Sequence, residues 1–239
     1  MTKTTREVFA DAEELAIHGA ALLNAAVETA RRPPRICLAG GSTPKRLYEL
    51  LAGPPFVFEF PWDVAHWFFG DERFVPHDHK DSNARMVSEA LFNKVPVSSD
   101  NKHFVPTRAS SPEVAAASYE RELQKIYGAE ALDPKEPMFD IVLVGFGDDG
   151  HTASLFPGTP AVNETTRWMA TTVGVKPEPR LSLTFPVLNS ARHVIILGAG
   201  ASKADVVKRV ARGEDLPLTK IRPTGELHWM LDKAAAGEK

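Results

Sequence analysis

Hydrophobic and polar positions along this chain follow two periodicities in turn, which predicts strands alternating with helices. Short apolar runs bounded by turn residues predict strands over Arg35–Ala39, Val64–Phe69, Phe139–Val144, Trp168–Val173, Leu181–Phe185 and His193–Leu197. Helical patterns lie between several of them, over Pro44–Leu51, Asn83–Phe92, Pro112–Tyr127 and Ser202–Arg212. This alternation favours an α/β fold, with an open, mostly parallel sheet covered by helices on both faces.

The two segments outside this alternation are the N-terminus and a central connection. Apolar residues from Val8 to Val27 recur at helical spacing and stop at Arg31-Arg32-Pro33-Pro34, so we expect the first element to be a helix. The stretch Val95–Pro112 contains proline and serine and is a candidate long connection. With 239 residues and no internal repeat, we expect a single domain over residues 1–239.

Composition excludes several classes of partner. A formal net charge of −3 gives no electrostatic reason to expect nucleic acid or an anionic membrane, and no obligate protein partner is indicated. No apolar run approaches the roughly 20 residues of a membrane helix, and the acidic, amphipathic N-terminus is unlike a secretory signal. The single cysteine, Cys37, lies in an apolar run and is typical of a core residue in a cytosolic protein. We therefore expect a cytoplasmic location.

The most informative stretch is the predicted strand Phe139–Val144 and the glycine turn that follows it. In open α/β sheets ligands bind outside the carboxyl ends of the strands, where this turn places Asp149 and His151. We expect a short helix to begin at Thr152–Leu155, whose dipole would favour a neutral His151 able to accept a proton. Asp149 could orient the imidazole and stabilise its charged form. A histidine that only caps a solvated turn is the structural alternative.

The same turn matches a dinucleotide-binding pattern, since Gly145, Gly147 and Gly150 satisfy G-x-G-x-x-G. Two features weaken this alternative. Asp148 and Asp149 would repel a pyrophosphate, and the expected acidic residue about 20 positions later is missing. The glycines therefore favour a small substrate beside His151, and no nucleotide cofactor is expected.

Two further loops follow predicted strands. Gly40 and Gly41 turn the chain, Ser42 or Thr43 can cap the next helix, and the exposed amides there can bind phosphate, although a plain helix start fits equally well. Asp71 and Arg73 are alternate residues that leave a buried strand and can both face the crevice, and a surface ion pair is their alternative.

His77-Asp78-His79 suggests a metal site, but its spacing matches no standard zinc pattern, and we predict no metal there. Arg180 and Lys203 each lie beside a strand or glycine turn. Two cations that converge on one crevice suit an oxyanion such as phosphate, and each alone could be a surface charge.

Taken together, these segments closely resemble the 6-phosphogluconolactonase family and, more distantly, the glucosamine-6-phosphate isomerase/deaminase group. The resemblance spans nearly the whole chain. It rests on GGSTP at 40–44, GDER at 70–73, DSN at 81–83, GFGDDGHTASLFPG at 145–158, RLSLTFPVLN at 180–189 and GAGASK at 198–203. It implies a Rossmann-like, three-layer α/β/α fold and hydrolysis of 6-phospho-D-glucono-1,5-lactone in the oxidative pentose phosphate pathway, without a cofactor.

The resemblance also implies roles for individual residues. His151 corresponds to the family's base, and the residues near the phosphate correspond to Gly41, Ser42, Thr43, Arg73, Arg180 and Lys203. Asp71 aligns with the acid that serves as the proton-transfer base of the deaminases. Those deaminases also carry a glutamate five residues after the histidine, where this chain has Phe156, and this departure favours the lactonase.

Overall fold

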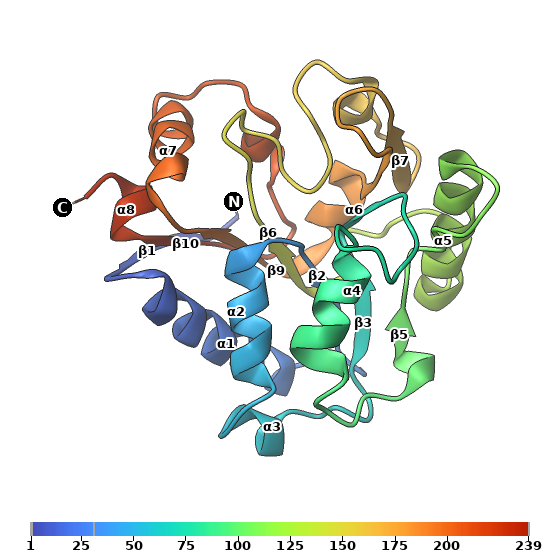
Figure 1. The fold of residues 1–239 in the computed structure, drawn as a ribbon, viewed down its shortest axis with the longest axis horizontal. Coiled ribbons are helices and arrows are strands. Elements are labelled where there is room, and N and C mark those ends of the chain that lie inside the picture. The colour runs from blue at the N-terminus through green and yellow to red at the C-terminus, as the bar shows by residue number, and fades with distance from the viewer. Residues whose placement is uncertain (1, 31, 239) are drawn as a thin grey trace.

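A computed structural model of the protein describes residues 2–30 and 32–238 and contains a seven-stranded sheet in the order β1-β10-β9-β6-β2-β3-β5 (Figure 1). Every pair of neighbouring strands in it is parallel. Its strands are β1 Thr4–Phe9, β2 Arg35–Leu38, β3 His66–Phe69, β5 Lys102–His103, β6 Phe139–Val144, β9 Ala191–Gly198 and β10 Glu226–Asp232. The predicted open parallel α/β fold is confirmed.

Helices connect these strands and cover the sheet as its outer layers. Helices α1, α2 and α4 pack together with the π-helical turn η1, while α6 packs against β9 (Figure 1). The helices are α1 Ala12–Glu28, α2 Ser42–Leu51, α3 Phe56–Glu59, α4 Asn83–Val87, η1 Ser88–Phe92, α5 Pro112–Tyr127, α6 Phe185–Asn189, α7 Ala204–Ala211 and α8 Lys233–Ala236; short 3₁₀ turns are η2 Ser99–Asn101, η3 Pro160–Asn163, η4 Ala201–Lys203 and η5 Pro217–Lys220. Among the described residues, no helix is long and apolar enough to cross a bilayer.

The N-terminal prediction was wrong in one respect, because the first element is a strand. Residues Thr4–Phe9 form β1, which pairs with β10 from Thr4 opposite Leu227 to Phe9 opposite Asp232. The helix begins only after Asp11, whose carboxylate accepts hydrogen bonds from the amides of Glu13 and Glu14. Val8 therefore belongs to an edge strand that is held by pairing with a segment more than 200 residues away, which helical spacing alone could not reveal.

A second, three-stranded antiparallel sheet stands apart from the main one. It has the order β4-β8-β7, with β4 Asp71–Arg73, β8 Arg180–Leu183 and β7 Met169–Thr172. The predicted strands Trp168–Val173 and Leu181–Phe185 correspond to β7 and β8 and therefore lie outside the parallel sheet. The predicted long connection over 95–112 contains η2 and the edge strand β5. Figure 1 shows β7 beside α5, and the two are in contact.

The chain reverses its direction across the main sheet between β2 and β6. From β2 the chain moves outward through β3 to β5, and after β6 it moves the other way through β9 to β10. Such a switch point opens a crevice at the carboxyl ends of the strands, because the connections on its two sides leave in opposite directions. All six residues of β6 are buried, so this central strand fixes the floor of the crevice.

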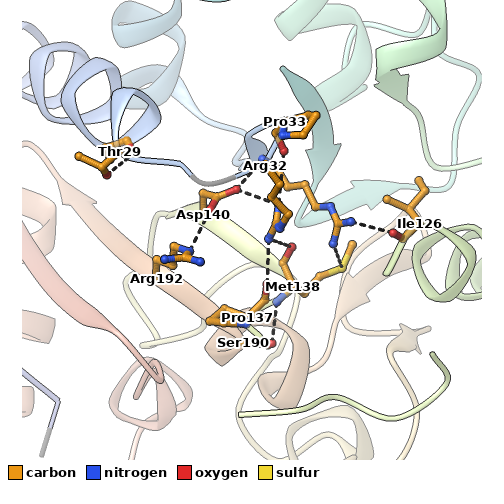
Figure 2. Close-up of polar contacts among 11 residues, drawn as sticks. Thr29, Arg32, Pro33, Ile126, Pro137, Met138, Asp140, Ser190 and Arg192 are labelled. Carbon is orange, nitrogen blue, oxygen red and sulfur yellow. Dashed lines mark hydrogen bonds and ion pairs between the residues drawn. The ribbon is translucent and has the colours of Figure 1, made fainter. Parts of the chain in front are cut away.

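A buried carboxylate joins the amino ends of the three central strands. Asp140 in β6 is fully buried, and its Oδ2 accepts hydrogen bonds of 2.9 Å from both Arg32 Nη1 and the amide of Arg35 in β2 (Figure 2). The Nε of Arg192 in β9 lies 3.1 Å from Asp140 Oδ1. Arg32 also donates to the carbonyls of Pro137 and Met138. One carboxylate therefore holds β2, β6 and β9 in register.

We predict that Asp140→Asn lowers the free energy of unfolding by about 3–5 kcal/mol, because it removes the only charge that compensates this arginine cluster within the described residues. The amide cannot restore the contacts, since its NH₂ group would face either Arg32 or Arg192. Urea unfolding followed by circular dichroism measures the loss. Glu13→Gln, which breaks an exposed pair with Arg46, should shift the midpoint far less. Equal shifts in the two variants would contradict a central role for Asp140.

Candidate functional site

A cavity of about 300 Å³ opens at the switch point between β2 and β6. Its walls come from the loops that follow β2, β3, β6 and β9, as expected for the carboxyl edge of a parallel sheet. Most of the predicted site residues meet there, namely Gly41, Ser42, Thr43, Asp71, Arg73, His151 and Lys203. Asp149 and Arg180 do not line the cavity and instead lie behind residues that do.

His151 and Asp149 form a hydrogen-bonded pair in the wall of the cavity. The ring Nδ1 of His151 lies 2.5 Å from Asp149 Oδ1, and the same oxygen accepts from the His151 amide at 3.0 Å. Burial alone would raise the pKa of Asp149, but these hydrogen bonds and the nearby imidazole hold it below its ordinary value. The carboxylate therefore stays ionised and fixes the ring with Nδ1–H toward Asp149 and Nε2 unused by the pair.

Two neighbours border this imidazole closely. A β-carbon on Gly147 would lie 2.0 Å from the ring Cε1 and 2.2 Å from Nδ1, so the ring can take this position only beside a glycine. The ring of Phe156, itself buried, lies against His151 with centroids 4.5 Å apart. His151 therefore has a buried aromatic side chain, and not a second acid, as its neighbour on this side.

The expected helix at Thr152–Leu155 is absent, and this segment is a turn. Thr152 makes isolated bridges with Phe146 and with Leu155, and Ala153 has a φ of +48°. The amide of Gly147 bonds to the carbonyl of His151. The backbone amides are thus used in a compact loop, so no helix dipole acts on His151. Its ring is oriented by the hydrogen bond to Asp149 and by its packing against Phe156 and Gly147.

Asp71 lines the cavity with both carboxylate oxygens held by donors. Ser154 Oγ donates to Oδ2 at 2.7 Å, and Asn83 Nδ2 lies 3.3 Å from Oδ1 and 2.9 Å from the Asp71 carbonyl. Gly40 leaves room for this amide, since a β-carbon there would lie 2.1 Å from Asn83 Oδ1. Sequence reasoning gave Asn83 and Ser154 no role. The DSN segment at 81–83, which is part of the family resemblance, could have indicated a role for Asn83. No local sequence pattern links Ser154 to Asp71, which lies 83 positions earlier.

The buried carboxylate of Glu72 holds the segment that joins β4 to α4. It is 1% exposed and accepts hydrogen bonds from the amides of Arg73, Asn83 and Ala84 and from Ser82 Oγ. Burial raises its pKa, and the three amides oppose that shift. A buried acid thus ties the start of α4 to β4, which places Asp71 and Asn83 side by side.

Arg73 and Arg180 are neighbours on the antiparallel strands β4 and β8. The Nε atoms of both are buried without a hydrogen-bond partner among the described residues. Partial burial and the charge of Arg73 lower the pKa of Arg180, while Asp71 opposes the change. Two adjacent guanidinium groups with unused donors favour an anion between or beside them.

The first turn of α2 supplies backbone donors on another wall. The helix begins at Ser42, and Gly41 is the N-cap with a φ of +106° and no side-chain cap. The expectation that Ser42 or Thr43 caps this helix is wrong. Since the first amides of a helix have no intrahelical acceptor, Ser42 and Thr43 bring free N–H groups to the cavity that they line.

Lys203, at the end of η4, lines the cavity next to the His151 turn. Its Nζ lies 2.9 Å from Asp148 Oδ1. The side chain of Asp148 is largely exposed and that of Lys203 is mostly covered, so the ion pair holds the lysine in place at the rim of the cavity. The sequence indicates Asp148 only as a group that would repel a pyrophosphate. In the structure Asp148 also positions Lys203.

The histidines of the 77–79 loop have separate partners. His77 Nε2 lies 2.7 Å from the carbonyl of Val105, and its ring packs near Phe104. His79 Nδ1 lies 3.7 Å from Asp81 Oδ2. These contacts fit structural roles for both rings, and the expectation that this loop binds no metal stays a prediction.

Known proteins match this chain in sequence and structure. It is 46% identical to 6-phosphogluconolactonase of Synechocystis sp. over 84% of the chain and 82% of the relative. It is 42% identical to 6-phosphogluconolactonase of Nostoc sp. over 99% of the chain and 98% of the relative. The solved 6-phosphogluconolactonase of Trypanosoma brucei superposes with a TM-score of 0.86 at 31% identity, covering 99% of both chains.

The family profile described as glucosamine-6-phosphate isomerases/6-phosphogluconolactonase matches residues 10–229, which include every element of the cavity. The chain belongs to the glucosamine-6-phosphate isomerase/6-phosphogluconolactonase family.

Proposed function

We propose that this protein hydrolyses 6-phospho-D-glucono-1,5-lactone to 6-phospho-D-gluconate by histidine-assisted attack of water. Relatives that carry the name 6-phosphogluconolactonase support the overall reaction. The observation that carries the mechanism is the His151–Asp149 pair in the cavity wall, with Nδ1 bound to the carboxylate. A neutral imidazole oriented in this way has Nε2 available as a base.

The proposed chemistry needs one proton carrier. His151 Nε2 removes a proton from the water as the water oxygen attacks the lactone carbonyl. The imidazolium is stabilised by Asp149 and then gives the proton to the ring oxygen when the C–O bond breaks. Because Asp149 is held ionised, it can balance the positive charge at the moment it forms.

The cations of the cavity are suited to hold the phosphate away from the reacting carbonyl. Arg73 and Lys203 line the cavity and supply charge, and Arg180 adds charge from beside Arg73. The amides of Ser42 and Thr43 supply neutral donors. An anchor at C6 positions the ester relative to His151, which converts attack by water into an ordered, nearly unimolecular step.

The rival enzyme reaction is amino-sugar phosphate deamination with Asp71 as the carbon-proton base. Ser154 and Asn83 already bond to both carboxylate oxygens of Asp71, which a carbon-proton base would have to free. Phe156 stands where the deaminase relay has its glutamate. Release of ammonia from glucosamine 6-phosphate would support the rival, and ligand binding without turnover of either substrate would indicate a sensor.

We predict that His151→Asn lowers kcat for the phosphorylated lactone by about 10²–10⁴-fold, because a positioned general base contributes that much. Binding of 6-phosphogluconate should change only a few-fold, since the phosphate anchors remain. A stopped assay corrected for spontaneous hydrolysis measures kcat, and calorimetry measures binding. A folded variant with near wild-type turnover would show that His151 is not the base and make Asp71 the leading candidate.

Gly147→Ala should displace the imidazole from Asp149, because the added carbon would overlap the ring. We expect kcat to fall by about 10²-fold, the cost of an ångström-scale misplacement, and the downfield proton signal of the Nδ1–H bond to disappear. Gly53→Ala is the control, since Gly53 lies outside the cavity and the atom nearest to its β-carbon is the Leu50 carbonyl oxygen at 3.5 Å. If the signal persists in Gly147→Ala, the geometry of the turn does not fix His151.

Lys203→Ala and Arg180→Ala should weaken recognition of the phosphate by about 2–5 kcal/mol each if the contacts are desolvated. The readout is the ratio of kcat/KM for the phosphorylated lactone to that for glucono-1,5-lactone, which should shrink in both variants. Arg46→Gln, on the surface of α2 and paired with Glu13, should leave the ratio unchanged. An unaltered ratio in both cavity variants would place the phosphate elsewhere.

A further inference from the structure

A second cluster of ligand-type side chains lies at the opposite edge of the sheet. His193 lies near the start of β9, and Glu226 and His228 lie at the start of β10, with Glu226 in register with His193. Alternate residues of a strand share a face, so Glu226 and His228 are on the same side of the sheet. The cavity is built on the carboxyl ends of the strands, so this cluster is separate from it.

The distances in the cluster match the needs of a tetrahedral ion. His193 Nδ1 lies 3.2 Å from His228 Nε2, and His228 Nε2 lies 3.7 Å from Glu226 Oε2. One donor atom from each of the three residues falls within 4.8 Å of the others. Zinc bonds of about 2.0–2.1 Å in tetrahedral geometry hold ligand atoms about 3.3–3.4 Å apart, so little movement is required.

The neighbouring strand orients one of the ligands. Thr5 Oγ1 in β1 lies 3.1 Å from His228 Nδ1. When Nδ1–H donates to this hydroxyl, the lone pair of Nε2 points to the side where His193 and Glu226 lie. A hydrogen bond at the far nitrogen of a ligating histidine is the usual second partner at metal sites.

We propose that His193, Glu226 and His228 bind one zinc-type divalent metal ion at the amino edge of the sheet. Two imidazole nitrogens and one carboxylate oxygen suit Zn²⁺ better than Mg²⁺ or Ca²⁺, which prefer oxygen ligands. The ion joins β9 to β10 and, through Thr5, reaches β1. Its role is to stabilise this edge, and it takes no part in lactone hydrolysis.

Lys3 competes with the ion for Glu226. Its Nζ lies 3.1 and 3.2 Å from the two carboxylate oxygens, and its side chain is mostly exposed. An ion at the cluster would displace this ammonium into solvent. Lys3 is therefore expected to weaken the affinity of the cluster for the ion. Replacing Lys3 should strengthen ion binding, whereas replacing a ligand should weaken it.

The test titrates Zn²⁺ into the full chain after dialysis against EDTA, using a chromophoric chelator as competitor. We expect saturation at one ion per chain and a rise in melting temperature, because the folded strands assemble ligands that are dispersed in the unfolded chain. Glu226→Gln and His193→Gln should each weaken binding at least about tenfold, whereas Lys3→Met should tighten it. Both ligand variants alter partly exposed side chains, so folding should be preserved.

His77→Asn/His79→Asn is the matched control and should bind Zn²⁺ as the wild type does. Co²⁺ should give visible absorption typical of nitrogen and oxygen ligands in the wild type and lose it in Glu226→Gln. The proposal is overturned by absence of saturable binding, by undiminished affinity in both ligand variants, or by loss of binding in the control. Hydrolysis by the EDTA-treated protein should match that of the zinc-loaded protein. A requirement for zinc would overturn the metal-free mechanism and the purely structural role, while the binding data alone decide whether the site exists.

Discussion

The contact on which the rest of this structure depends is the one between the buried Asp140 carboxylate and the arginines around it. A buried charge without partners costs several kcal/mol, so the cations of Arg32 and Arg192 must lie beside Asp140. Strand β2 must also bring the backbone amide of Arg35 to the same row. This requirement fixes the register of the central strands at their amino ends. The carboxyl ends of β2 and β6 are then fixed as well, and they form the crevice between them.

The site at that crevice is built from charges that have already been given partners. His151 is held by Asp149, Lys203 by Asp148, and Asp71 by Ser154 and Asn83. Among the residues that the structure describes, the buried Nε groups of Arg73 and Arg180 have no hydrogen-bond acceptor. Pre-organised groups need little rearrangement when substrate binds. The unpaired donors indicate where binding energy for an anion remains to be gained.

Sequence patterns identified the buried centre of this fold better than its edges. The bounds of Phe139–Val144 could be predicted because all its residues except Asp140 are apolar. Strands β1 and β10 were missed because each is held by pairing with a distant segment, which leaves no local pattern. The loops that form the cavity could be identified because their polar residues directly follow predicted strands. The internal geometry of these loops could not be predicted. The turn after His151 depends on bridges from Thr152 to Phe146 and to Leu155, which the spacing of residues does not indicate.

Strand β9 takes part in charged clusters at both the amino and the carboxyl edge of the sheet. β9 begins with Arg192 beside Asp140 and His193 beside Glu226, and it ends at Gly198, from which the chain leads to Lys203. Between these two ends lie four buried apolar residues, Val194, Ile195, Ile196 and Leu197, which separate the two charged clusters. Because the charged residues of the amino edge do not line the cavity, substitutions there change stability without changing the groups that carry the chemistry. A residue at the amino edge should affect hydrolysis only by changing the fraction of folded protein.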